Sequence, residues 1–530
     1  MSGPLESVLI TGGMILDGTG SEAQPGSLLI KNGRIDAVLP SDGRPDAGRV
    51  IDASGRAVSP GFIDLHSHAD FTVQATPGAE SQLRQGVTTL LTGNCGLSPF
   101  PVVDREALIA ASAFVGGDLA WSWTDAAGYA DACDRDGMAI NIALQVGHNA
   151  LRIAAMGADQ REPTDLELDR MRTLLVQAAD QGAYGFSTGL IYAPGSYAST
   201  AEVDALVAEA GRQGLLYSTH IRNEGDHLLP AVEEAIRAAR LGSARLEISH
   251  LKAMAPRNFG RVGDALALIE RGRAEGLDVA CDVYPYDASS TTLTARLPGW
   301  ALDGGVPALL HRLADPETSQ GLAAELTEAE SRQLPADRVR VASGPEFGRT
   351  LAEIAERRGI GPAEATLQVL QEQHGSVSVI NHGMSADDVR TVLRHRFSSV
   401  ASDGWIMAGP QDRGWRVGHP HPRSFGTFTR VLGHYGRDEG TISLAEAVRK
   451  MTSLPASRLG IADRGVIRPG AVADVIIFDP GTVADLASYE QPWQLSTGVS
   501  DVLIGGVAVL SEGRSTGSRP GRVLRRPRTT

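Results

Sequence analysis

The chain has 530 residues, of which 42% are hydrophobic and 21% charged, a composition typical of a globular protein. Its net charge of −14 argues against nucleic acid as a partner, and no apolar run is long enough to cross a bilayer. Three cysteines in so long a chain exclude a disulfide framework, so we expect reduced thiols and a cytoplasmic protein. Because one hydrophobic core stops growing at roughly 250–300 residues, we expect more than one domain.

Both ends of the chain are predicted to form short strands. Asn32 and Gly33 lie between two apolar runs, which is a strong signal for a two-residue β-hairpin. Strand-like runs with glycine turns recur in ADVIIFDP and SDVLIGGVAVL near the C-terminus. We therefore expect residues 1–59 and 462–530 to form one small β-sandwich domain, ending in a basic, solvated and mobile tail, GRVLRRPRTT.

Residues 60–461 show a different pattern, in which apolar β-rich runs alternate with amphipathic helical segments. Eight such runs predict an α/β protein with a (β/α)8 barrel. The runs are 62–65, 87–91, 140–146, 183–187, 215–219, 245–249, 278–283 and 398–401. More than a hundred residues separate the last two runs, so we expect an insert or lid at about 286–397.

Polar side chains that bind metals or protons stand at the ends of five predicted strands. His66 and His68 are two residues apart, so their side chains share one face of a strand. The ends of four other runs carry Cys95, His220, His250 and Asp403. Any one of these residues alone is more often structural, but all six at one barrel opening indicate a common site. Imidazole and thiolate together suit zinc.

Several segments of the chain resemble the N-acyl-D-amino-acid deacylases (D-aminoacylases) of the amidohydrolase superfamily. They include GFIDLHSHAD, GVTTLLTGNCGLSP, GFSTGLIYAPG, THIRNEGD, ISHLK, DVYPYDASST, SDGW and HPHPRSFGTFTRVLGHY. The His-x-His pair marks only the superfamily, whereas the Asn-Cys-Gly and HPHPRSFGTF segments are more specific. The resemblance extends over nearly the whole chain and implies a barrel with a small β-sandwich built from both termini.

The resemblance also implies a metal site and a reaction. It assigns the tighter zinc to Cys95, His220 and His250, and a second, weaker metal position to His66 and His68, with Cys95 able to bridge. Asp403 is then the catalytic acid/base. The reaction implied is hydrolysis of an N-acyl-D-amino acid to a carboxylate and a free D-amino acid. A clamp for the substrate α-carboxylate is assigned to Lys252, Tyr284 and Arg423.

Two other functions stay open at this point. A cyclic-amide hydrolase of the hydantoinase or dihydroorotase type shares the barrel and the metals. It is expected to keep a lysine on the fourth strand, where this chain reads YGFSTGLIY. A non-catalytic scaffold with this fold is expected to have lost ligands, whereas all six positions are filled here.

The amino-acid side chain that the enzyme accepts is predicted from residues around the start of the insert. Apolar residues near the start of the insert, together with Ile191, predict a pocket for apolar D-amino acids such as D-Met, D-Leu or D-Phe. We interpret Arg296, beside a Pro-Gly turn, as a solvated arginine. On this interpretation acidic D-amino acids are poorer substrates.

Overall fold

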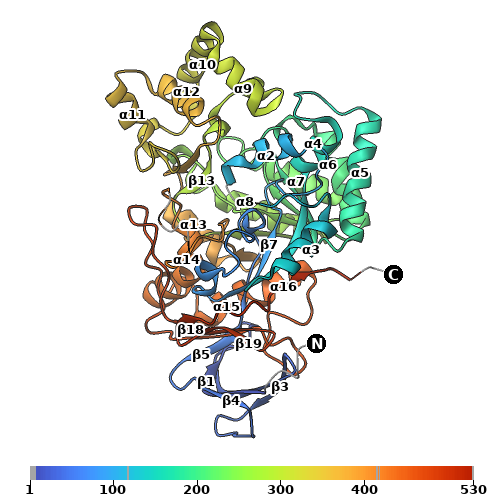
Figure 1. Ribbon diagram of the computed structural model, residues 1–530, viewed down its shortest axis with the longest axis vertical. Helices are drawn as coiled ribbons and strands as arrows, with labels where there is room; N and C mark the ends of the chain where they lie inside the picture. The colour runs from blue at the N-terminus through green and yellow to red at the C-terminus, as the bar shows by residue number, and fades with distance from the viewer. Residues whose placement is uncertain (1–6, 116–118, 413–415, 417, 528–530) are drawn as a thin grey trace.

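Eight parallel strands form a nearly closed barrel, in the order in which they occur in the chain (Figure 1). The computed structural model describes residues 7–115, 119–412, 416 and 418–527. An isolated bridge between Ser67 and Gly404 joins the first strand to the last. The strands are β6 (Phe62–Asp64), β7 (Val87–Thr92), β8 (Asn141–Gly147), β9 (Gly185–Gly189), β10 (Leu216–His220), β11 (Arg245–Ile248), β12 (Val279–Val283) and β16 (Ser398–Val400). Each overlaps one predicted apolar run, and the predicted barrel fold is confirmed.

Several helices between the strands begin at polar caps. Thr164 forms a capping box with Glu167 at the start of α5, and the Ser199 hydroxyl accepts a hydrogen bond from the Glu202 amide at α6 (3.4 Å). The helices are α1 (Glu80–Leu83), α2 (Arg105–Ser112), α3 (Ala126–Asp136), α4 (His148–Met156), α5 (Asp165–Asp180), α6 (Thr200–Arg212), α7 (Leu228–Gly242), α8 (Val262–Ala274), α13 (Ala386–Arg394), α14 (Arg423–Arg430), α15 (Leu444–Met451) and α16 (Ser453–Leu459).

A nine-stranded sheet combines strands from both ends of the chain. Its central contact is the antiparallel pair of β5 and β17, and Asn32 and Gly33 turn the chain between β2 and β3 with positive φ angles. The strands are β1 (Val8–Ile15), β2 (Gln24–Lys31), β3 (Arg34–Leu39), β4 (Arg49–Asp52), β5 (Ala57–Pro60), β17 (Val475–Phe478), β18 (Val499–Ile504), β19 (Val507–Ser511) and β20 (Arg514–Ser515). The division into domains at 59 and 462 stays a prediction, and residues 1–6 and 528–530 lie outside the described part.

The prediction of a mobile C-terminal tail is wrong as far as residue 527. β21 (Val523–Leu524) pairs in parallel with Ile142 and Ala143 of β8, and Val523 is buried. β9 pairs with β8 only from Gln145 onward, so the beginning of β8 has free backbone groups on that side. The apolar Val-Leu pair, embedded in a basic sequence, satisfies those groups and covers the gap.

The insert between β12 and β16 has a hydrophobic core of its own, separate from the barrel core. It lies on the opposite side of the barrel from the nine-stranded sheet (Figure 1). α13, although within the predicted insert range, packs against α8 and the barrel strands. The elements of the insert are β13 (Ser289–Thr292), α9 (Gly305–Ala314), α10 (Pro316–Ala329), β14 (Val339–Val341), α11 (Leu351–Arg358), α12 (Pro362–Glu372) and β15 (Ser378–Asn381). Among the described helices of the whole chain, none is long and apolar enough to cross a membrane.

Candidate metal centre

The six predicted residues meet at the carboxyl ends of the barrel strands. Each lies within four residues of a strand end, and each has at most 6% of its surface exposed. They are His66 and His68 after β6, Cys95 after β7, His220 at the end of β10, His250 after β11 and Asp403 after β16. This is the end of a barrel where active sites are built.

Cys95 belongs to two groups of side chains whose ligand atoms lie within 4.8 Å of one another. One group contains Cys95, His220 and His250, and the other contains Cys95, His66, His68 and Asp403. The Cys95 Sγ atom lies 3.2 Å from His66 Nε2, 3.8 Å from His220 Nδ1 and 3.7 Å from His250 Nε2. The geometry therefore provides two adjacent positions for metal ions with one shared sulfur.

Carboxylates face the outer nitrogens of three of the four imidazoles. Glu224 places one oxygen 3.0 Å from His250 Nδ1 and the other 3.5 Å from His220 Nε2. Asp282 lies 3.5 Å from His66 Nδ1. Metal-binding histidines commonly have such partners, which orient the ring and direct the other nitrogen at the metal. The chemistry and orientation of the donor atoms thus fit zinc.

The backbone that carries these residues requires glycine at two positions of the TGNCG segment. Gly93 and Gly96 both have positive φ, and a Cβ atom on Gly93 would lie 2.1 Å from the Gln145 carbonyl oxygen. Cys95, His250 and Asp403 also have positive φ, a conformation that costs a residue other than glycine roughly 1–3 kcal/mol. The barrel therefore holds three site residues in strained conformations, which is common at functional sites.

The charges of the site favour a thiolate and a carboxylate. Burial acts to raise the pKa of the Cys95 thiol, but the charge of His66 and hydrogen bonds from His220 and His250 outweigh it and hold that pKa well below its usual value. Burial also acts to raise the pKa of Asp403, and the attraction of Arg423 and His66 holds it well below its usual range.

The three residues predicted to bind a carboxylate are buried beside the candidate metal ligands. Arg423 Nη1 lies 2.8 Å from Asp403 Oδ2, and its guanidinium carbon is 4.9 Å from the centre of the Tyr284 ring. Lys252 Nζ lies 2.5 Å from Glu224 Oε1 and 2.7 Å from His250 Nδ1. The structure brings Lys252, Tyr284 and Arg423 together, with Lys252 already paired to Glu224.

Arg423 lines a small space with His68, Cys95 and Asp403. A neighbouring cavity of about 220 Å³ is lined by Lys252 and Tyr284 together with His220, His250 and Asp403. Sequence reasoning missed Tyr192 and Thr291, which line the same cavity and are joined by a 3.0 Å hydrogen bond between their hydroxyl groups. Tyr192 stands three residues after β9 in the GLIYAPG segment, a position that offered a signal. Thr291 belongs to the insert, whose approach to the barrel no local pattern indicates.

The interpretation of Arg296 as a solvated arginine is wrong. Arg296 is half-buried and lines the same cavity as His220 and Asp403. Burial lowers the pKa of its guanidinium to about 10, with attraction to Glu330 offsetting part of this effect. Its Nη1 donates a hydrogen bond to the Leu334 carbonyl oxygen (3.1 Å), and it forms no ion pair among the described residues. The fold of the insert brings this cation to the cavity.

A family model and individual relatives show to which protein family the chain belongs. The model of the amidohydrolase family matches residues 49–510.

The chain belongs to the amidohydrolase family.

Similar proteins within this family are deacylases. The N-acyl-D-glutamate deacylase of Alcaligenes xylosoxydans xylosoxydans is 38% identical over 98% of this chain and 96% of that protein. The D-aminoacylase of the same organism is 35% identical over 98% of this chain and 97% of that protein. This structure also matches a crystal structure of the N-acyl-D-glutamate deacylase from Bordetella bronchiseptica with a TM-score of 0.83. That crystal structure contains zinc and a phosphonate mimic of the tetrahedral intermediate. The two chains are 38% identical, and the match covers 98% of this chain and 99% of the Bordetella chain. The resemblance to N-acyl-D-amino-acid deacylases is confirmed.

Glu224 offers a test of the metal centre of this amidohydrolase. We expect Glu224→Gln to weaken zinc binding about 10- to 100-fold, because His220 and His250 lose the carboxylate that orients them. Competition with a chromogenic chelator measures the zinc dissociation constant.

Glu234→Gln is the matched control, since Glu234 pairs with Arg222 and touches none of the ligands. An unchanged zinc affinity in Glu224→Gln would show that this carboxylate does not support the site.

Proposed function

We propose that the chain is a zinc-dependent hydrolase of N-acyl-D-amino acids that releases a carboxylate and a free D-amino acid. The observation that carries the proposal is a convergence around two adjoining spaces that share Asp403. Two metal-ligand groups with Cys95 in common meet there with the carboxylate of Asp403 and the buried cations Lys252 and Arg423. The deacylase relatives, similar over nearly the full length of the chain, support it.

We assign the tighter zinc to Cys95, His220 and His250, and a second, weaker position to His66 and His68 with Cys95 shared. When bound, zinc lowers the pKa of a water molecule toward about 7 and polarises a carbonyl oxygen.

Asp403 moves the proton in this proposal. Its carboxylate accepts a proton from water, the water oxygen bonds to the acyl carbon, and the carbon–nitrogen bond then breaks as Asp403 returns the proton to the amine. Its Oδ1 atom lies 3.3 Å from His66 Nε2 and 3.2 Å from His68 Nε2, at the edge of the ligand groups. This position supports the proposal that Asp403 serves both steps.

Arg423, Tyr284 and Lys252 are proposed to bind the substrate α-carboxylate. An arginine guanidinium has five N–H donors. In Arg423, Nη1 contacts Asp403 and Nη2 donates a hydrogen bond to the Ser290 carbonyl oxygen. A charge-assisted contact from this fixed group sets the orientation of the α-carbon. Such orientation is the basis on which we propose selection of D over L substrates.

The two alternative functions are less well supported. A cyclic-amide hydrolase is disfavoured because the strand that is expected to carry its lysine, β9, has none, and Cys95 fills the shared position instead. A scaffold without activity is disfavoured because every ligand atom faces inward and three imidazoles have carboxylate partners.

We further propose that the preferred substrates carry an acidic side chain, as in N-acyl-D-glutamate or N-acyl-D-aspartate. Arg296 presents a partly desolvated positive charge to the cavity without an ion-pair partner, and leaving such a charge unpaired is costly. A substrate carboxylate removes that cost. This proposal replaces the expectation of apolar side chains.

We also infer a reducing compartment, the cytoplasm, as the place of action. Cys95, Cys133 and Cys281 are all free and buried, and the proposed metal site needs Cys95 as a thiolate. Small-molecule substrates are the only partners that the proposal requires.

The role of Asp403 is tested by replacing it with an amide. We expect Asp403→Asn to keep the zinc bound by Cys95, His220 and His250 and to lower kcat for N-acetyl-D-glutamate about 10²- to 10⁴-fold, because an amide cannot relay the proton. Released D-glutamate and bound zinc are measured on the same preparation, with N-acetyl-L-glutamate as the stereochemical control. Asp412→Asn, which replaces an exposed carboxylate on the loop that follows Asp403, is the matched control variant. Wild-type turnover in Asp403→Asn would assign proton transfer to another residue.

The role of Arg296 is tested by the ratio of kcat/KM for N-acetyl-D-glutamate to that for N-acetyl-D-leucine. We expect the wild-type ratio to exceed ten and Arg296→Ala to lower it at least tenfold, since a charge-assisted contact contributes about 1.5–3 kcal/mol. Arg338→Ala, an exposed arginine of the same insert, should leave the ratio unchanged. A wild-type preference for leucine would restore the apolar assignment.

A further inference from the structure

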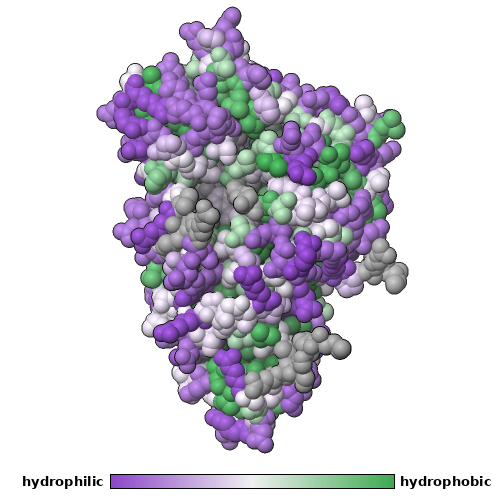
Figure 2. All heavy atoms as spheres, viewed as in Figure 1, coloured by the Kyte–Doolittle hydropathy of each residue, from purple (hydrophilic) through white to green (hydrophobic). Residues whose placement is uncertain are grey.

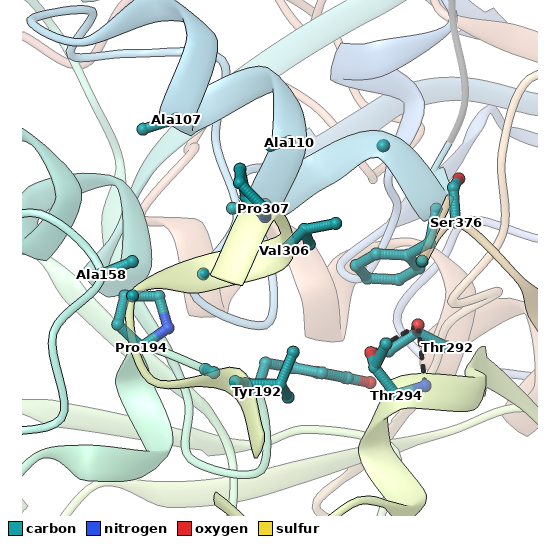
Figure 3. A pocket seen from close by; sticks show the side chains of 18 of the residues that line it. Ala107, Ala110, Ala158, Tyr192, Pro194, Thr292, Thr294, Val306, Pro307 and Ser376 are labelled. Atoms are coloured by element: carbon teal, nitrogen blue, oxygen red, sulfur yellow. Dashed lines mark hydrogen bonds between the residues drawn. The ribbon is translucent and has the colours of Figure 1, made fainter. Parts of the chain in front are cut away.

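A second cavity, of about 400 Å³, lies between the insert and the barrel beside the site cavity. Its volume is in the range of roughly 300–1,000 Å³ that is usual for small-molecule sites. In Figure 3, α2 with Ala107 and Ala110 lies above it, and Tyr192, Thr292 and Thr294 lie below. Ala158 and Pro194 line it at the left of the view, and Val306 and Pro307 of the insert lie at the centre.

The walls of this cavity are mainly small and apolar. Apolar side chains also gather on the surface where the insert meets the barrel (Figure 2). Among the described residues that line the cavity there is no lysine or arginine, and the acids Asp104 and Glu106 are both exposed. Asp104 is engaged as the cap of α2, where it accepts a hydrogen bond from the Ala107 amide (3.0 Å). Such walls favour a neutral apolar group and disfavour an anion.

The apolar cavity adjoins the site cavity and shares part of its wall. Ile191, Tyr192, Thr292 and Ala295 line both cavities. The Tyr192 ring lies 5.2 Å from the His220 ring and stacks on Phe114 at 5.9 Å, measured between ring centres. Tyr192 and Phe114 also line a small space that is bounded by Cys95 and Asp403. One aromatic pair therefore separates the metal ligands from the apolar cavity.

The two cavities differ in charge, as the two halves of the proposed substrate do. The cations Lys252 and Arg296 line the first cavity and match the amino-acid half with its carboxylates. The second cavity, without a cation, matches the acyl half. We propose that it binds a linear aliphatic acyl chain of about six to ten carbons, so that the enzyme prefers medium-chain N-acyl-D-amino acids to N-acetyl ones. This inference rests on the proposed function, whose site it extends.

The test compares N-octanoyl and N-acetyl derivatives of the same D-amino acid, namely the one that the wild-type holoenzyme hydrolyses fastest as its N-acetyl derivative. Each fully buried methylene contributes up to about fourfold in affinity, so we expect kcat/KM for the octanoyl substrate to be at least tenfold higher. Filling the cavity from opposite walls, with Ala110→Phe or Ala158→Leu, should lower the octanoyl-to-acetyl ratio at least tenfold. Ala324→Phe, on the exposed side of α10, is the control and should keep the wild-type ratio.

The outcomes separate this inference from the function on which it rests. Hydrolysis of the acetyl substrate with no gain for the octanoyl substrate would overturn the acyl cavity and leave the deacylase function in place. A ratio that neither filling variant changes, in protein that still hydrolyses the acetyl substrate, would also overturn it. If neither substrate is hydrolysed by the zinc-loaded enzyme, the proposed function fails and the inference fails with it.

Discussion

The site depends on one buried sulfur atom that three imidazoles approach from three other barrel strands. The thiol of Cys95 lies 3.2–3.8 Å from nitrogens of His66, His220 and His250, and it belongs to both groups of metal-ligand atoms. This arrangement is possible only because the TGNCG turn places Cys95 inward with positive φ, between two glycines that tolerate close backbone contact. The nearly closed parallel sheet brings the other strand ends to the same opening.

The remaining features of the site extend outward from that sulfur. Glu224 and Asp282 orient the imidazoles, and Asp403 connects the ligand groups to Arg423. Beyond Arg423, the insert covers the opening and adds Arg296 to one cavity and an apolar wall to the other. In this account the barrel supplies the chemistry, whereas the insert selects the substrate, which is the usual division between a rigid scaffold and its loops.

Local sequence pattern predicts the barrel and the positions of the candidate ligands at its strand ends, for physical reasons. Buried parallel strands read as continuous apolar runs, and a polar side chain directly after such a run lies at the carboxyl end of the sheet, as His220 and His250 do. Where contacts depend on distant segments, prediction fails. Val523 is buried only because β8 has an unpaired edge, and Arg296 is desolvated only because the insert folds onto the barrel. The pairing of Glu224 with Lys252 likewise joins the loops after β10 and β11.

The most direct test of this account is the zinc content of Cys95→Ala, measured by elemental analysis after dialysis, together with its rate on an N-acetyl-D-amino acid. We expect the wild-type protein to retain about one tightly bound zinc per chain, since three protein ligands and a water molecule form a catalytic zinc site. Cys95→Ala should lose both the zinc and the activity, whereas Cys133→Ala, at a buried cysteine outside both ligand groups, should keep both. Full zinc occupancy in Cys95→Ala would contradict the central role of this sulfur.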